Sequence, residues 1–176
     1  MSLLRGSSVT LVPVERRHLE RTREWANDPE LMRLLGRDRT VTPEEHEAWF
    51  TSLSAARDRL YMAIEQTETG RHIGNVWLWD IDERHRRAEL RIVIGDSSST
   101  GRGLGTEAID VLSRHAFGTL GLRRVYAYVL GFNARARRAF EKAGFALEGV
   151  LKEDRLSAGR PVDVYVLSRL DPGHRA

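Results

Sequence analysis

A turn that carries three glycines is the stretch of this sequence best suited to bind a ligand. The turn consists of Thr100, Gly101, Arg102, Gly103, Leu104, Gly105 and Thr106. The residues that follow have helical spacing, with Leu104, Ala108, Val111, Leu112 and His115 along one face. Backbone N–H groups at the start of a helix lack a partner within the helix and carry a partial positive charge. The turn therefore predicts an anion site, and a phosphate is the usual anion.

Two common phosphate-binding motifs fit this turn poorly. A Walker loop needs a Gly-Lys pair, which the sequence lacks. Gly103, Gly105 and Ala108 do satisfy the dinucleotide fingerprint G-x-G-x-x-[GA]. That fold also needs an acidic residue at the end of the next strand, whereas the strand here ends in 128–131 without one. A dinucleotide site is therefore disfavoured, and a glycine turn without any ligand remains an alternative.

The composition narrows the class of protein. The chain has 176 residues, enough for one domain with its own core, and it has no cysteine for disulfides or thiolate chemistry. Its net charge of +3 comes from interspersed charges, whereas nucleic-acid footprints are more one-sided. No apolar run approaches the ~20 residues of a membrane span, and the start lacks the apolar core of a signal peptide. The histidines lack metal-ligand spacing. We expect a cytoplasmic protein with no nucleic acid, membrane or metal partner.

The apolar periodicity predicts an α+β domain with a mixed, mostly antiparallel sheet. Strands are predicted at 8–14, 59–66, 71–82, 88–95, 122–130, 145–156 and 161–170. Helices are predicted at 16–28, 42–53, 104–117 and 133–144. Thr42, Pro43 and Glu45 form a capping-box start, and Asn133 and Gly144 are typical of a helix start and end. The chain thus has about seven strands and about four helices.

Two motifs in the second half of the chain resemble one known family. The segment 100–105 corresponds to the pattern Q/R-x-x-G-x-G/A, and "NARARRAFEKAGF" at 133–145 resembles N-x-x-A-x-x-x-Y-E-K-x-G-F. From Ala88 to Leu170 the chain is similar to the GNAT superfamily of acetyl-CoA-dependent N-acetyltransferases, and within it to the RimJ/RimL-like branch. The resemblance covers about half of the chain closely. It implies the GNAT-like acyl-CoA N-acyltransferase fold for residues 1–176, with an acceptor-side half (1–87) and an acetyl-CoA-binding half (88–170).

The resemblance also implies a set of residues that bind acetyl-CoA. They are Ile92, Val93, Ile94, Thr100, Gly101, Arg102, Gly103, Leu104, Gly105, Thr106, Asn133 and Phe140. Backbone amides of the turn would hold the pyrophosphate, and the pantetheine arm would lie along 92–94. Thr100 brings no charge where the family has Gln or Arg, so Arg102 becomes the expected cation. Phe140 replaces a tyrosine that protonates the leaving thiolate in many members, and a phenyl ring cannot donate a proton.

The expected reaction moves an acetyl group from acetyl-CoA to a primary amine. A protonated amine needs a base, and Glu89 is the candidate. It lies eleven residues before Thr100, the offset at which histone acetyltransferases of the superfamily carry their general-base glutamate. A plain strand glutamate paired with Arg91 or with the 84–87 loop is the alternative. Tyr126 and Tyr128 are candidate proton donors, with core packing as their alternative role.

Several alternatives stay open. The chain could be a non-catalytic acyl-CoA-binding module, or a transferase that uses a longer acyl-CoA. The acceptor could be a protein N-terminus, an amino sugar or another small amine, and acids such as Asp28, Glu30, Glu44 and Glu45 are candidates to attract it. Asn133 could be only a helix cap. Trp77 and Trp79 share one strand face, either in the core or with one of them at the acceptor pocket. A homodimer is one option for the assembly.

Overall fold

The structure is a computed structural model that describes residues 3–174. Its strands are β1 (Leu4–Arg5), β2 (Val9–Pro13), β3 (Leu60–Gln66), β4 (His72–Asp82), β5 (Arg87–Ile94), β6 (Arg124–Leu130), β7 (Ala146–Ser157) and β8 (Arg160–Leu170). Its α-helices are α1 (Leu19–Ala26), α2 (Pro29–Leu34), α3 (Pro43–Leu53), α4 (Leu104–Gly118) and α5 (Ala134–Lys142). None of the helices in this part of the chain is long and apolar enough to cross a membrane.

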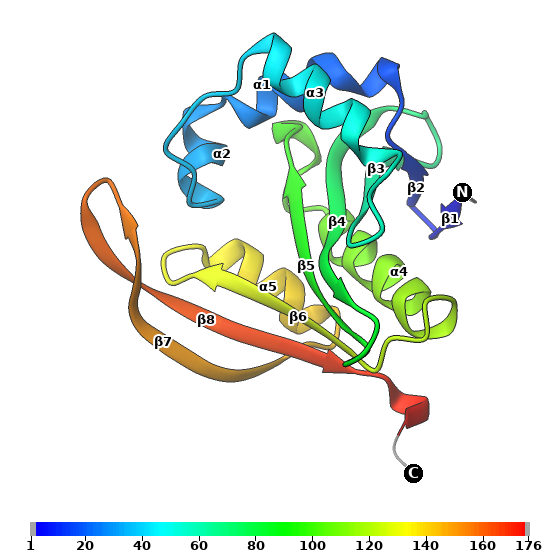
Figure 1. Ribbon diagram of the computed structural model, residues 1–176, viewed down its shortest axis with the longest axis vertical. Helices are drawn as coiled ribbons and strands as arrows, with labels where there is room; N and C mark the ends of the chain where they lie inside the picture. The colour runs from blue at the N-terminus through cyan, green and yellow to red at the C-terminus, as the bar shows by residue number, and fades with distance from the viewer. Residues whose placement is uncertain (1–2, 175–176) are drawn as a thin grey trace.

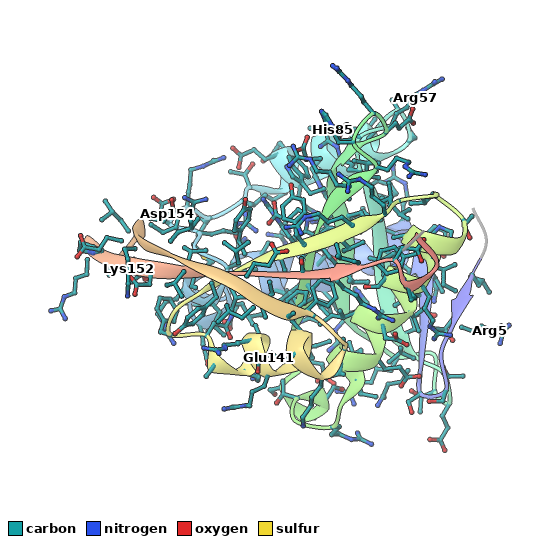
Figure 2. The ribbon with its side chains drawn as sticks, turned by 90° about the horizontal axis from the view of Figure 1, so that it is seen from below. Arg5, Arg57, His85, Glu141, Lys152 and Asp154 are labelled. Carbon is teal, nitrogen blue, oxygen red and sulfur yellow. The ribbon has the colours of Figure 1, made fainter. Side chains whose placement is uncertain are left out.

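The strands form one sheet in the order β1-β2-β3-β4-β5-β6-β8-β7. Neighbouring strands run antiparallel except β5 and β6, which are parallel. The predicted mixed, mostly antiparallel sheet is therefore confirmed, with β1 as an additional strand at the edge. Figure 1 shows that the β7–β8 hairpin extends beyond the rest of the sheet, and Figure 2 shows Lys152 and Asp154 near its far end.

Helix α2 is the other element that the sequence pattern did not predict. It has only six residues and begins at Pro29, where the missing N–H of proline costs nothing. The Asp28 carboxylate caps it by accepting a hydrogen bond from the Leu31 N–H at 2.9 Å. Figure 1 places α2 on the same side of β5 as the β7–β8 hairpin, and this position matters for the site.

The main hydrophobic core lies between the sheet and α4. This helix packs against β1, β2, β4, β5 and β6, and α5 packs against α4 and β8. Ala108, Ile109 and Leu112 of α4 are fully buried in this core. His115 was predicted on the same face but is only half-buried, and burial lowers its pKa.

The opposite face of the sheet is polar and aromatic. Side chains alternate along β4, so that Val76 faces the core while Asn75 and Trp77 face α1 and α3. Asn75 is buried and donates a hydrogen bond to Thr22 of α1 at 3.2 Å. Between this face and helices α1 and α3, the polar and aromatic side chains are less closely packed than an apolar core, and a ligand can bind there.

Candidate functional site

The parallel strands β5 and β6 separate after three paired residues, and this separation opens the site. The pairs are Arg87 with Arg124, Ala88 with Val125, and Glu89 with Tyr126. β5 continues to Ile94 and β6 to Leu130, without further pairing between the two among residues 3–174. The two strands therefore diverge beyond Glu89 and Tyr126. Backbone N–H and C=O groups of β5 beyond Glu89 on that side are left for another partner.

Two cavities adjoin at this separation. The larger has a volume of about 990 Å³ and extends to the glycine turn, and the smaller has about 340 Å³ and lies toward α1 and α2. Both volumes are in the range of small-molecule sites, roughly 300–1,000 Å³. The residues that line both cavities are Leu34, Leu35, Ile92, Val93, Asn133 and Ala136. A ligand in one cavity can therefore reach a ligand in the other beside β5.

The glycine turn forms the floor of the larger cavity at the start of α4. Gly101 and Gly103 have φ values of +75° and +81°, in the left-handed region that favours glycine. A Cβ at either position would meet no described atom within 4 Å, so the space above the backbone is open. Thr100 also lines this cavity, but its hydroxyl donates to the Ser97 carbonyl at 2.8 Å. The uncovered amides at the start of α4 fit an anion such as a phosphate.

Three basic side chains of α5 line the same cavity. Arg135, Arg138 and Lys142 are exposed and form no ion pair within residues 3–174. Their spacing of three and seven residues places them on one helical face. Arg102, the cation expected for the pyrophosphate, is exposed and does not line the cavity. The sequence reasoning missed the three α5 cations, although their helical spacing could have revealed them.

The start of α4 is also tied to the N-terminal segment. The Glu107 carboxylate accepts hydrogen bonds from the Ser7 N–H, from the Ser7 hydroxyl at 2.9 Å and from the Ser8 N–H at 2.9 Å. Burial raises the pKa of Glu107, but the hydrogen bonds from Ser8 and Ser7 outweigh it and hold the pKa below its usual range. Glu107 therefore stays ionised and fixes the segment that closes one side of the larger cavity.

Asn133 links the two halves of the site. Its Oδ1 accepts a hydrogen bond from the Ala136 N–H at 3.1 Å, which caps α5, and its Nδ2 donates to the Leu34 carbonyl of α2 at 3.3 Å. The helix cap is confirmed, and the same residue also lines both cavities. Phe140 lies elsewhere: it is 3% exposed, packs edge-to-face on Phe145 and lines neither cavity.

Aromatic rings form the floor of the smaller cavity. Trp77 of β4 and Tyr61 of β3 stack with ring centres 4.7 Å apart and an angle of 15° between planes. Trp49 of α3 contacts the Tyr61 ring edge-to-face at 4.9 Å. Trp77 thus faces the cavity, whereas Trp79 lies outside it beneath the guanidinium groups of Arg59 and Arg91.

Glu89 lies at the point where the two strands separate, and it lines the smaller cavity. Its side chain is buried, and the Arg91 guanidinium donates to both carboxylate oxygens at 2.7 and 2.8 Å. The ion pair raises the pKa of Arg91 against the effect of burial. The pairing with Arg91 that we considered as an alternative is present, but on a buried rather than an exposed glutamate. The structure places this carboxylate in the wall of the smaller cavity, where β5 and β6 separate.

The two tyrosines of β6 differ in their surroundings. Tyr126 is 8% exposed, and burial raises its pKa. Tyr128 is 44% exposed and lines the smaller cavity, so core packing is not its role. Both phenolic hydroxyls can donate a proton, but only Tyr128 lines the cavity, so Tyr128 is the better placed of the two candidates.

Two of the acids that were candidates to attract the acceptor have structural roles. Asp28 caps α2, and Glu45 completes the capping box of α3 while it pairs with Arg39 at 2.6 Å. Together with Glu30 and Glu44, they lie outside the residues that line either cavity. The expectation that these acids attract the acceptor is therefore not supported by their positions.

Buried histidines connect α1 to the sheet beside the site. His18 contacts Glu65 through Nε2 at 2.9 Å, and its ring lies 4.7 Å from the ring of His72. His72 donates from Nε2 to Asn75 at 3.1 Å. Burial lowers the pKa of His72 to about 4. This network holds Thr22 and Trp25 of α1, which line the smaller cavity.

Comparison with known proteins gives a family. The family model for the acetyltransferase (GNAT) domain matches residues 8–146. The chain is 32% identical over 154 residues to a spermidine N(1)-acetyltransferase of Escherichia coli (strain K12), covering 84% of this chain and 77% of that protein. It is 31% identical over 123 residues to an uncharacterised N-acetyltransferase, YoaA, of Bacillus subtilis (strain 168), covering 70% of this chain and 69% of that protein.

The fold agrees with these relatives. The crystal structure of spermidine N-acetyltransferase from Vibrio cholerae in complex with CoA and spermine superposes with a TM-score of 0.87 at 27% identity, over 94% of this chain and 96% of that chain. The GNAT fold expected from the two motifs is confirmed. The family match extends over well more than half of the sequence, and the chain therefore belongs to the GNAT family of N-acetyltransferases.

Proposed function

We propose that this enzyme transfers the acetyl group of acetyl-CoA directly to a primary amine in the gap where β5 and β6 separate. The observation that carries the proposal is the meeting of two cavities beside Ile92 and Val93, one with an anion site and one with an aromatic floor. Acetyl-CoA would occupy the larger cavity, and the amine would occupy the smaller. The similar enzyme of Vibrio cholerae forms a complex with both CoA and spermine, which supports a site for CoA and a site for an amine in this fold.

The described residues suit the parts of acetyl-CoA. Backbone amides of 101–106 would hold the pyrophosphate, and the α5 cations Arg135, Arg138 and Lys142 would balance its charge. The pantetheine arm would pair with the free edge of β5 at 92–94 as an additional strand. Asn133 would contact this arm at the junction of the cavities. We assign Thr100 and Arg102 smaller roles than their motif positions suggest, and Phe140 a packing role.

The reaction balances without a covalent enzyme intermediate. The neutral amine nitrogen attacks the thioester carbonyl carbon, so that a C–N bond forms and the C–S bond breaks. The amine loses a proton, and the departing thiolate gains one. Glu89 would take up the first proton through a water molecule, because Arg91 occupies both carboxylate oxygens. Tyr128 would give a proton to the thiolate, or water would do so.

The division of the chain into an acceptor-side half (1–87) and an acetyl-CoA half (88–170) is part of this proposal in a modified form. α1, α2, the loop that follows α2, β3 and β4 line one part of the smaller cavity, and β5, β6, α5 and the β7–β8 hairpin line the rest, so that both halves of the chain contribute to it. Placement in the RimJ/RimL-like branch, the cytoplasmic location and a homodimer stay predictions.

The test is acetyl transfer to a panel of amines, measured as release of free CoA thiol and as the mass of the acetylated product. We expect transfer to at least one primary amine and none to a matched tertiary amine, which has no proton to lose. Hydrolysis of acetyl-CoA at the same rate with and without amine would contradict the proposal.

A further inference from the structure

The charges that line the smaller cavity are unusual for a site that receives a cation. The charged residues in its wall are Arg37, Glu89, Arg91 and Arg155, three positive and one negative. The single carboxylate is already paired, because Arg91 donates to both of its oxygens. A second ammonium group on an acceptor would therefore find no free carboxylate among the charged residues that line this cavity.

Arg37 is the charge in this wall that lacks a partner. Arg91 pairs with Glu89, and Arg155 pairs with Asp154 beside it on the β7–β8 hairpin. The Arg37 guanidinium forms no hydrogen bond or ion pair within residues 3–174, and this exposed residue lines the cavity from the loop that follows α2. A polyamine would place positive charge beside this guanidinium, whereas an anion would form an ion pair with it.

Tyr61 adds a hydrogen-bond donor at the same place. Its ring stacks on Trp77 in the cavity floor, and its hydroxyl has no hydrogen-bond partner among the described residues. Burial raises the pKa of this hydroxyl, and the positive charges of Arg37 and Arg91 act against that effect. Both guanidinium groups thus lie close enough to Tyr61 to act on a charge there. The hydroxyl stays protonated near neutral pH and can donate to an acceptor.

We propose that the smaller cavity takes a primary amine that also carries a carboxylate or a similar compact anion, with Arg37 and the Tyr61 hydroxyl as the groups that bind the anion. This inference rests on the proposed acetyl transfer and names the class of acceptor. The cavity volume of about 340 Å³ and its aromatic floor fit a small amphoteric molecule. Guanidinium groups suit carboxylates because their N–H groups form a fork that matches two oxygens.

The test uses acceptors that differ only at the end remote from the amine. These are 4-aminobutyrate, n-butylamine and 1,4-diaminobutane, with 4-(aminomethyl)benzoate and 4-methylbenzylamine as an aromatic pair. Both kcat/KM for acetyl transfer and the Kd for binding to the protein–CoA complex are measured at low ionic strength. We expect the carboxylate-bearing member of each series to be preferred by about ten- to a hundredfold, the range of one charge-assisted hydrogen bond.

Variants of Arg37 decide whether this residue causes the preference. Arg37→Gln should remove most of the preference by weakening the binding of the acidic acceptors. It should leave kcat/KM for n-butylamine within about threefold of wild type. Arg37→Lys should keep part of it, and Arg37→Glu should turn it toward 1,4-diaminobutane. Arg57→Gln is the matched control, because Arg57 is exposed, lines neither cavity and lies far from the β7–β8 hairpin (Figure 2). It should leave the preference unchanged.

The outcomes separate this inference from the proposed function. Transfer that favours 1,4-diaminobutane, or a carboxylate preference that survives in Arg37→Glu, would overturn the assignment of an acidic acceptor while acetyl transfer itself stands. Absence of transfer to every amine would overturn the proposed function. In that case the Kd values still decide the inference, because tighter binding of the acidic acceptors that depends on Arg37 supports it and equal binding of all acceptors contradicts it.

Discussion

Replacing Glu89 by glutamine tests whether this carboxylate accepts the proton of the amine. Glutamine keeps the shape and can still accept from Arg91, but it cannot take up a proton. Glu89 is buried, while the side chain of its partner Arg91 is 44% exposed and can turn to water. We therefore expect a loss in unfolding free energy of only about 1–2 kcal/mol, below the 3–5 kcal/mol of a fully buried broken pair. The protein should remain folded at 25 °C.

The expected loss of activity is larger than the loss of stability. General-base catalysis typically contributes about 10²–10⁴-fold, which corresponds to roughly 3–5 kcal/mol in the barrier. kcat/KM for n-butylamine, which has no second charged group, is measured from about pH 6 to about pH 10. Its deficit in Glu89→Gln should shrink toward high pH as the free amine accumulates. The wild-type profile should rise with pH through one ionisation. The profile should show no fall at high pH from the ionisation of a tyrosine at position 140, because Phe140 cannot ionise.

Arg91→Gln is the matched control for this experiment. It breaks the same ion pair but leaves the Glu89 carboxylate in place. If Glu89 acts as the base, Arg91→Gln should retain most of the activity that Glu89→Gln loses. Equal losses in the two variants would mean that the pair only shapes the cavity. Activity of Glu89→Gln within about threefold of wild type near pH 7 would remove Glu89 from the mechanism.

Three further changes test the co-substrate site and the buried histidines. CoA at a hundred times its Kd should raise the Tm of the wild-type protein by about 5–10 °C, and Gly103→Asp should abolish this rise. Gly159→Asp is the control and should keep the rise, because Gly159 has a similar φ of +73° but lies in a distant turn. Replacing both Arg138 and Lys142 by glutamine should raise the Kd for CoA about tenfold at low salt and less at high salt, as calorimetry can show. His72 has a pKa of about 4 in the fold and about 6.5 unfolded, so the unfolded chain binds the extra proton and stability falls with falling pH. Urea unfolding should show about 2 kcal/mol less stability at about pH 5 than at about pH 7, and a smaller difference in His72→Gln.

Local signals in the sequence predicted most elements correctly. The capping box of Thr42 and Glu45 and the cap of Asn133 lie where the pattern placed them, because these motifs satisfy backbone groups within one turn. α2 escaped prediction because six residues cannot show a helical period, and its start depends on the cap from Asp28. β1 has two residues and exists only through its pairing with β2.

The candidate site was predictable in its backbone and not in its side chains. The glycine turn was recognisable as a candidate anion site because its positive φ values favour glycine. Arginine is frequent along the whole chain, so nothing in the sequence distinguishes Arg37, which lines a cavity, from Arg102, which does not. That distinction arises from the distance between strands and helices that are far apart in sequence. The position of Phe140 was equally unpredictable, because its match to the family motif did not indicate that its side chain lies in the core.

The crystal structure of the enzyme with CoA and a non-reactive acceptor analogue is the most direct test of acetyl transfer between β5 and β6. The account predicts the pyrophosphate on the amides of 101–106 and the pantetheine arm along 92–94. It also predicts the sulfur at the junction that Asn133 and Val93 line, facing the cavity of Glu89. CoA bound outside the gap, or a sulfur that points away from that cavity, would contradict it.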